Sequence, residues 1–148
     1  MKHYDYGNAG IYFITICTHH KSCLLSTVGR GLAPAEIRLT EYGEIAEQQL
    51  LLLKKRYPFL NIDQYVIMPN HIHAIFILEK QTAGASPRPT VTDIVCAYKS
   101  LTTKFCKAAK PIDKLFQDSF YEHIIRNYND YRETVNYIRN NPLLWNHK

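Results

Sequence analysis

Two apolar segments joined by a Pro-Asn dipeptide constrain the fold of this chain more than any other feature. The segments Ile62–Met68 and His71–Leu78 are rich in β-branched and aromatic residues, which indicates strands. Pro69-Asn70 is a tight-turn signal, so the two strands are expected to pair antiparallel. The second segment is apolar on both faces except at His71 and His73, and this favours a central position in the sheet.

Further strands are predicted before and after this hairpin. Ile11–Cys17 and Phe120–Arg126 are both rich in β-branched and aromatic residues. Ile37–Leu39 is a candidate for a short additional strand, and the glycine-containing stretch Val28–Ala35 is predicted to be a loop.

Two segments between the predicted strands have the periodicity of amphipathic helices. The first begins after Thr40 as its N-cap and ends near Arg56, and the second begins after Thr90 or Thr92. Their expected buried faces consist of Tyr42, Ile45, Ala46, Gln49, Leu52 and Leu53 in the first helix, and of Ile94, Ala97, Tyr98, Leu101 and Phe105 in the second.

The order of elements, with a last helix described below, is β-α-β-β-α-β-α. Antiparallel pairing within the hairpin, combined with helical crossovers elsewhere, predicts a ferredoxin-like α+β fold: an antiparallel sheet with helices on one or both faces. A length of 148 residues fits one domain, which is expected to span residues 1–148.

Composition favours a polyanionic partner. The formal net charge is +5, the sequence pI is about 9.0, and 11 tyrosines supply rings on which unpaired bases could stack. The chain has four cysteines and no CxxC pair, so we expect a reduced protein whose cysteines mostly pack. Neither a secretory signal nor a membrane-spanning run is visible, which predicts a cytoplasmic location without membrane attachment.

The histidine pair is a candidate metal site. Side chains alternate along a strand, so His71 and His73 project from the same face and can reach one ion. The alternative is a pair of hydrogen-bonded core histidines. An otherwise apolar strand makes unpaired polar groups costly, which favours the metal. Two ligands leave most of a coordination sphere open to water, a substrate phosphate or another side chain.

The last helix carries a tyrosine and an asparagine on one side. The pattern Asp130-x-x-Glu133 resembles a capping box that opens it, and Pro142 is expected to end it. Tyr137 and Asn141 are one turn apart, so their side chains could reach into one site. The packing stripe consists of Tyr131, Val135 and Ile138.

Spacing alone does not select the nucleophile. A tyrosine hydroxyl attacks only when a metal or a positive charge stabilises its phenolate. Tyr137 could equally be an ordinary tyrosine at the edge of an amphipathic helix. Residue spacing does not favour it over Tyr121, Tyr128 or Tyr131.

Three motifs together resemble a known family. Residues 66–76, which include His71 and His73, are similar to the signature of the single-tyrosine HUH transposases. Residues 120–126, followed by Tyr137-Ile-Arg-Asn-Asn-Pro142, are similar to the REP-associated tyrosine transposases in particular. The resemblance covers nearly the whole chain, and the motifs occur in the family's order.

The resemblance implies a chemistry. His71 and His73 would bind Mg²⁺ or Mn²⁺, with Asn141 at a family position that can complete the metal shell. Tyr137, on the C-terminal helix, would attack a phosphate of hairpin-bearing single-stranded DNA and form a 5′-phosphotyrosine link. A 3′-hydroxyl could later reverse this step and rejoin the strand. Transposition and recombination at REP-like elements or element ends would follow.

DNA contacts and assembly are further expectations. We expect His123, Arg126, Lys99, Lys104 and Arg139 to contact DNA, which would make binding depend on salt. The protein could act as a monomer or as a homodimer, and would be associated with the nucleoid when bound to DNA. Two other functions stay open: a domesticated module that binds hairpins without cleavage, and a metal nuclease that uses water.

Overall fold

The computed structural model describes residues 9–29, 36–81, 84 and 86–145. A four-stranded antiparallel sheet forms its centre, in the spatial order β4-β5-β1-β6. The sequence order and this spatial order together make the ferredoxin-like arrangement that the sequence predicts, with β5 inside the sheet. The four strands are β1 (Gly10–Cys17), β4 (Leu60–Ile67), β5 (His71–Leu78) and β6 (Tyr121–Ile125).

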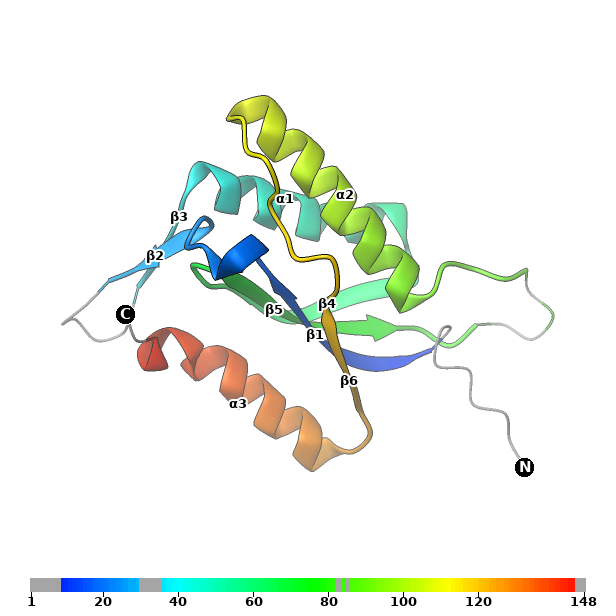
Figure 1. Cartoon of the computed structure of the whole chain (residues 1–148). Helices are drawn as coiled ribbons and strands as arrows, with labels where there is room; N and C mark the ends of the chain where they lie inside the picture. The colour runs from blue at the N-terminus through cyan, green and yellow to red at the C-terminus, as the bar shows by residue number, and fades with distance from the viewer. Residues whose placement is uncertain (1–8, 30–35, 82–83, 85, 146–148) are drawn as a thin grey trace.

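The helices lie on both faces of the sheet (Figure 1). Helices α1 (Glu41–Arg56) and α2 (Val91–Ala109) pack against each other over one face, and α3 (Tyr128–Leu144) covers the other. The larger core lies under α1 and α2, and β1 contributes Tyr12, Ile14 and Ile16 to it. The smaller core lies under α3, where Ile75, Ile125, Val135 and Ile138 are buried.

A small two-stranded sheet lies beside α1, and the sequence predicts only one of its strands. The predicted strand Ile37–Leu39 is β3, and it pairs with β2 (Ser26–Val28). The prediction of a loop over Val28–Ala35 is therefore wrong at Val28, whose apolar side chain is buried. Residues 30–35 of that predicted loop lie outside the described part of the chain.

Three details of the predicted helices need correction. In α2 the buried face is rotated toward Val91, Val95, Thr102 and Cys106, and Phe105 is 43% exposed. In α3 the N-cap is Asn127, whose side-chain oxygen accepts from the Asp130 backbone N–H at 2.8 Å. The helix also continues past Pro142 to Leu144. The predicted caps Thr40 and Thr90 are confirmed.

The four cysteines are unpaired, and Cys23 and Cys96 are exposed, so the expectation that most cysteines pack is met only by Cys17 and Cys106. Within the described residues, no helix combines the length and the apolar character that crossing a membrane requires.

Candidate functional site

Strand register places the candidate residues on the α3 face of the sheet. Thr15 in β1 lies opposite His73 in β5 on one side and opposite Tyr121 in β6 on the other. Directly paired residues project from the same face, so these three side chains form one row across the sheet. His71 lies next to Cys17 at the end of β1, one pleat repeat along from this row.

Each histidine of the pair is held through its Nδ1 atom. The His71 Nδ1 atom is 2.7 Å from Oδ1 of Asn70, and the His73 Nδ1 atom is 2.9 Å from the Thr15 hydroxyl oxygen. The two rings are 4.5 Å apart between centroids. Hydrogen bonds from one ring nitrogen to an oxygen are typical of metal-binding histidines, because they fix the ring and leave Nε2 for the metal.

Both ring nitrogens of His71 face amide oxygens, but a neutral imidazole has only one N–H to donate. Its Nε2 atom is 3.2 Å from Oδ1 of Asn141, while its Nδ1 atom faces the oxygen of Asn70. Asn141 is oriented by its own amide nitrogen, which donates to the Tyr137 carbonyl at 3.1 Å. A neutral imidazole carries one N–H, so one of these two contacts brings lone pairs together. A cation bound between the imidazole and an amide oxygen would remove that conflict.

Burial keeps both imidazoles in the neutral form that a metal requires. Desolvation, with a smaller contribution from the nearby His71, lowers the pKa of His73 to about 3. Desolvation also lowers the pKa of His71, although the hydrogen bond to the Asn141 amide oxygen raises it, and the Lys21 ammonium group lowers it further. Among the described residues, no group of three or more His, Cys, Asp or Glu side chains could hold a metal. The amide oxygen of Asn141 lies beside His71 and could act as a third donor.

Tyr137 lies beside the histidines of its own chain. Its ring centroid is 5.3 Å from that of His73 and 6.2 Å from that of Phe13, and its side chain is half exposed. Asn141 follows one turn later and contacts His71. The structure thus places Tyr137 beside His73 and Asn141 beside His71, and their sharing of one functional site stays a prediction.

The other candidate tyrosines are placed differently. The Tyr131 hydroxyl donates to Asp63 of β4 at 2.5 Å, and this hydrogen bond raises the pKa of Tyr131. Tyr128 stands at the start of α3 beside Arg132. Tyr121 contacts Phe13 from β6. Of the four, Tyr137 is the one whose ring lies against His73.

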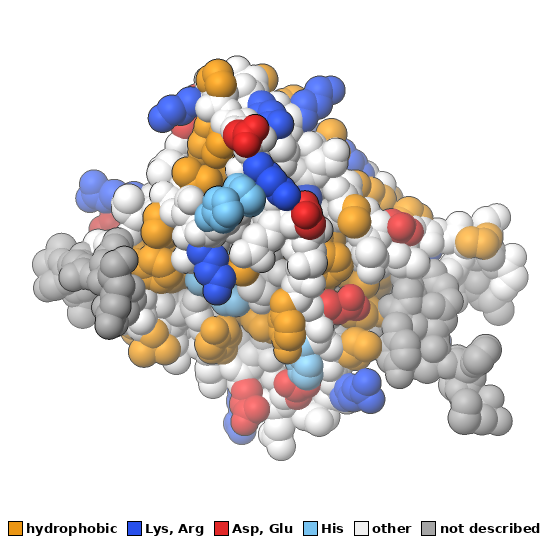
Figure 2. Space-filling view, viewed as in Figure 1, with side chains coloured by type: hydrophobic (Ala, Val, Ile, Leu, Met, Phe, Trp, Pro, Cys, Tyr) orange, Lys and Arg blue, Asp and Glu red, His pale blue; other side chains and the backbone are white. Residues whose placement is uncertain are grey.

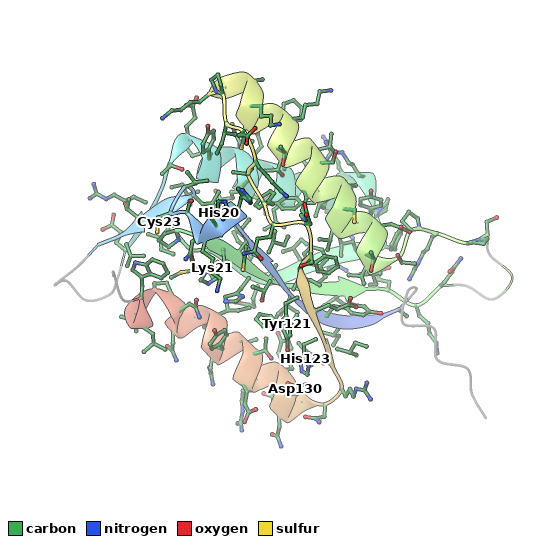
Figure 3. All side chains as sticks on the ribbon, viewed as in Figure 1. His20, Lys21, Cys23, Tyr121, His123 and Asp130 are labelled. Carbon is green, nitrogen blue, oxygen red and sulfur yellow. The ribbon has the colours of Figure 1, made fainter. Side chains whose placement is uncertain are left out.

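A strained turn places a lysine beside the site, and sequence reasoning missed it. His20 and Lys21 have positive φ angles of 56° and 52° within the short helix η1 (His19–Lys21). The left-handed conformation costs a residue other than glycine roughly 1–2 kcal/mol. The turn is fastened to the hairpin by Thr18, whose N–H and hydroxyl both donate to the Asn70 carbonyl, at 3.0 and 3.1 Å. Figure 3 shows Lys21 between η1 and the C-terminal half of α3.

The predicted DNA-contacting residues do not form one surface. His123 and Arg126 lie at the N-terminal end of α3, and the His123 Nε2 atom is 2.8 Å from Oδ2 of Asp130 (Figure 3). Arg139 is exposed on α3, one turn before the end of the described helix. Lys104 is exposed on α2, in the helical layer on the opposite side of the sheet.

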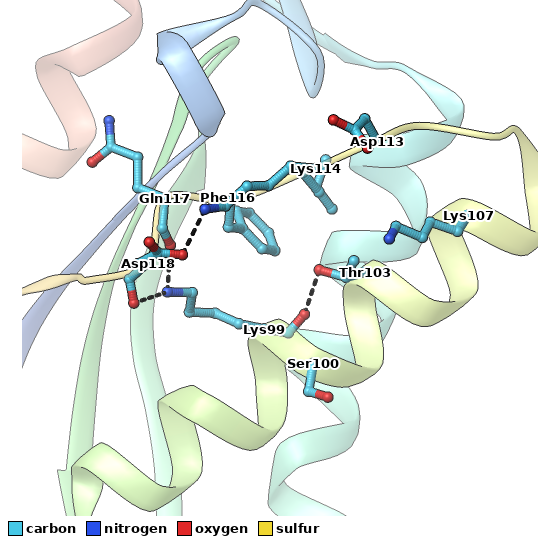
Figure 4. A pocket seen from close by; sticks show the side chains of 10 residues that line it. Lys99, Ser100, Thr103, Lys107, Asp113, Lys114, Phe116, Gln117 and Asp118 are labelled. Atoms are coloured by element: carbon cyan, nitrogen blue, oxygen red, sulfur yellow. Dashed lines mark hydrogen bonds and ion pairs between the residues drawn. The ribbon is translucent and has the colours of Figure 1, made fainter.

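Lys99 on α2 has a contact that the sequence does not reveal. Its ammonium group donates to the carbonyls of Gln117 and Asp118 at 2.6 and 3.0 Å (Figure 4). It thereby fastens the segment that leads into β6, in a hollow that also contains the 2.6 Å ion pair of Lys114 with Asp118. Contact of Lys99 and the other four residues with DNA stays a prediction.

The surface around the site is mixed in character. Figure 2 shows histidine and lysine side chains close together near the centre of this face, with hydrophobic side chains beside them. Tyr121, the first residue of β6, is an exposed aromatic side chain between β6 and α3 (Figure 3). The site thus combines neutral imidazoles, an ammonium group and exposed aromatic rings.

One relative and one solved structure that resemble this chain are REP-associated tyrosine transposases. A REP-associated tyrosine transposase of Escherichia coli is 30% identical over 105 residues, which are 71% of this chain and 57% of that protein. An uncharacterised protein of Haemophilus influenzae is 32% identical over 160 residues, covering 98% of this chain and 87% of the relative. A solved structure of a REP-associated tyrosine transposase bound to a REP hairpin matches 97% of this chain and 73% of its own, with a TM-score of 0.68 and 25% identity. No family profile matches the chain.

Proposed function

Because this chain is homologous to the REP-associated tyrosine transposases and shares their fold, we propose that it cleaves and rejoins hairpin-bearing single-stranded DNA through Tyr137. One observation carries the proposal. The half-exposed ring of Tyr137 lies 5.3 Å from His73, and Asn141, one turn later, contacts His71. The proposed nucleophile and the proposed metal donors would therefore share one space within a single chain.

The donor set fits a divalent cation. His71, His73 and Asn141 would hold Mg²⁺ or Mn²⁺, with the remaining positions left to water and to a phosphate oxygen of the DNA. The bound cation would stabilise the negative charge that develops on the phosphate during the reaction. One of the two contacts of His71 with amide oxygens brings lone pairs together, and this supports such a cation.

Tyr137 would supply the covalent step. Its hydroxyl loses a proton as its oxygen bonds to phosphorus, and the bond from phosphorus to the 3′ oxygen breaks. The leaving 3′ oxygen takes up a proton, so the products are a 5′-phosphotyrosine and a free 3′-hydroxyl. Attack by a 3′-hydroxyl on the phosphotyrosine reverses the step, so rejoining requires no other source of energy. Phe13 packs edge-on against the Tyr137 ring at 6.2 Å and would orient it.

The experiment detects the covalent adduct. The protein is incubated with Mn²⁺ and a labelled DNA hairpin that has single-stranded flanks, and the products are separated under denaturing conditions. We expect a protein–DNA adduct that chelator and Tyr137→Phe abolish. Tyr128→Phe is the matched control on the same helix, because that exposed ring lies beside Arg132 instead of His73. It should leave the adduct unchanged.

Other outcomes would replace the proposal. Cleavage that persists in Tyr137→Phe would identify a metal nuclease that uses water. Binding without cleavage under either metal, across hairpins of different sequence, would identify a binding module. A covalent adduct in a mixture of Tyr137→Phe and His71→Ala proteins would show that helices are exchanged between two chains.

A further inference from the structure

Two exposed tyrosine rings contact Phe13 from different elements. Tyr137 of α3 meets the Phe13 ring at 6.2 Å and an interplanar angle of 86°, and Tyr121 of β6 meets it at 6.4 Å and 75°. Phe13 itself is tilted by 31° against His73 at 5.1 Å. Phe13 thus supports both tyrosines next to the histidine pair.

The exposure of Tyr121 is not explained by packing. The side chain is 58% exposed, although it projects from the same face as the buried His73, in the same row across the sheet. Tyr121 begins the edge strand β6, and its backbone position is fixed by pairing with Thr15. Figure 3 shows Tyr121 between β6 and α3, on the side of β6 that faces α3. The Tyr121 ring therefore contacts Phe13 on one side and is exposed over more than half of its surface.

We propose that Tyr121 binds an unpaired nucleobase of the DNA strand by stacking, next to the phosphate that Tyr137 attacks. This inference rests on the proposed function, because it takes the ligand to be a single strand that passes the histidine pair. Every base offers a flat π-face, so an exposed, supported ring can bind it whatever its identity. Tyr121 and His73 are two strand spacings apart, which is roughly 10 Å.

The charges around the site agree with a strand that runs from Lys21 to Tyr121. Lys21 lies on the side of the site toward η1 (Figure 3). Tyr121 lies on the opposite side, toward β6. A phosphate held between the ammonium group and the histidines would leave the adjoining base over the Tyr121 ring. A partner without flat aromatic groups could not stack on the Tyr121 ring.

The test measures binding without cleavage. All variants are made in the Tyr137→Phe protein, and the probe is a DNA hairpin whose single-stranded flank carries 2-aminopurine at successive positions. Stacking quenches the fluorescence of this base, so we expect quenching at one flank position. Tyr121→Leu should abolish the quenching and raise the Kd about tenfold. Tyr121→Phe keeps the ring and should retain both quenching and affinity.

A matched control separates stacking from a general loss of aromatic surface. Tyr128→Leu removes a ring that is 71% exposed and lies at the start of α3, beside Arg132. It should change neither signal. Equal weakening by Tyr128→Leu and Tyr121→Leu would overturn the proposal, and so would undiminished quenching in Tyr121→Leu.

Failure of this inference can be distinguished from failure of the proposed function. Adduct formation by the wild-type protein, together with unchanged binding by Tyr121→Leu, would refute the stacking site alone. Quenching that depends on Tyr121 in a protein that forms no adduct would refute the cleavage activity and retain the stacking site. Absence of any binding of the probe by the Tyr137→Phe parent would overturn the stacking site as well.

Discussion

The face of the sheet under α1 and α2 and the face under α3 use alternate residues of the same strands. On β5, the first face receives Ile72, Ala74 and Phe76, all of them buried and apolar. The second face receives His71 and His73 from the same strand. Neighbouring residues thus serve packing on one side and chemistry on the other.

The α3 face is itself divided along the helix. Val135 and Ile138 pack on Ile75 and Ile125, and this contact anchors α3 to the sheet. Past this contact, the helix presents Asn141 to the polar end of β5, where the sheet offers histidines instead of apolar side chains. The contacts of Val135 and Ile138 can therefore fix the position of Asn141. Substitutions in the packed segment should change stability, and substitutions at the polar end should change activity.

The largest effect is expected from the polar side of β5. His71→Ala removes one metal donor and should lower adduct formation about a thousandfold, because the cation would no longer stabilise the developing charge. His71 is only partly buried, so the free energy of unfolding should fall by no more than about 1–2 kcal/mol. Adduct yield and urea unfolding of the same preparation measure the two quantities. Wild-type adduct yield in this variant would remove His71 from the site.

The neighbouring residue on the packed side should behave in the opposite way. Ile72 is 1% exposed and belongs to the larger core, so Ile72→Ala should lower the free energy of unfolding by about 2–5 kcal/mol. The folded fraction of this variant should still form the adduct. Urea unfolding followed by circular dichroism gives the first value. A folded Ile72→Ala protein without adduct activity would show that the two faces are coupled.

A smaller effect is expected from pH. Because burial lowers the pKa of His73 to about 3, the unfolded chain binds a proton below about pH 6.5 that the folded protein does not. The free energy of unfolding therefore falls as the pH decreases from about 6.5 toward 3, with a slope of at most about 1.4 kcal/mol per pH unit from His73. Above about pH 6.5 His73 causes no further change. Unfolding at several pH values measures this slope. The slope should be shallower in His73→Gln, and an equal slope would assign the pH dependence to other groups.

The smallest effect is expected from Lys21, at the edge of the polar region. Lys21→Met removes an ammonium group that lowers the pKa of His71, so this pKa should rise, as measured by NMR titration. Loss of one cation near the phosphate should also reduce adduct formation about tenfold. Lys55→Met, on the exposed side of α1, is the charge-matched control and should change neither value. Identical behaviour of the two variants would leave Lys21 outside the site.

Sequence patterns located the elements better than their ends and faces. The predicted α2 stripe differs from the observed one at Phe105, because Val95, Thr102 and Cys106 define a neighbouring stripe that is buried instead. Asp130 was expected to open the last helix, but the Asn127 side chain caps α3 and the Asp130 carboxylate contacts His123. Asn127 and Asp130 were both possible N-caps of α3. The Asp130 carboxylate contacts His123 of β6, and the Asn127 side chain is the cap.

Close contacts between distant segments were beyond sequence reasoning. A Cβ atom at Gly43 would lie 1.9 Å from the Leu25 carbonyl oxygen, so α1 can approach this segment only with glycine there. The Thr40 hydroxyl donates to the Leu24 carbonyl at 2.6 Å and helps to hold the same contact. Nothing in the local pattern around residue 43 indicates that constraint.

The sequence by itself determined the antiparallel hairpin, the common face of His71 and His73, and the helix that carries Tyr137 and Asn141. These depend on local periodicity, because side chains alternate along a strand and recur each turn of a helix. Only the tertiary structure decided which tyrosine lies against His73, that Asn141 contacts His71, and that Lys21 and Tyr121 flank the pair. These depend on how separate elements pack, and the chain's local pattern does not contain that information.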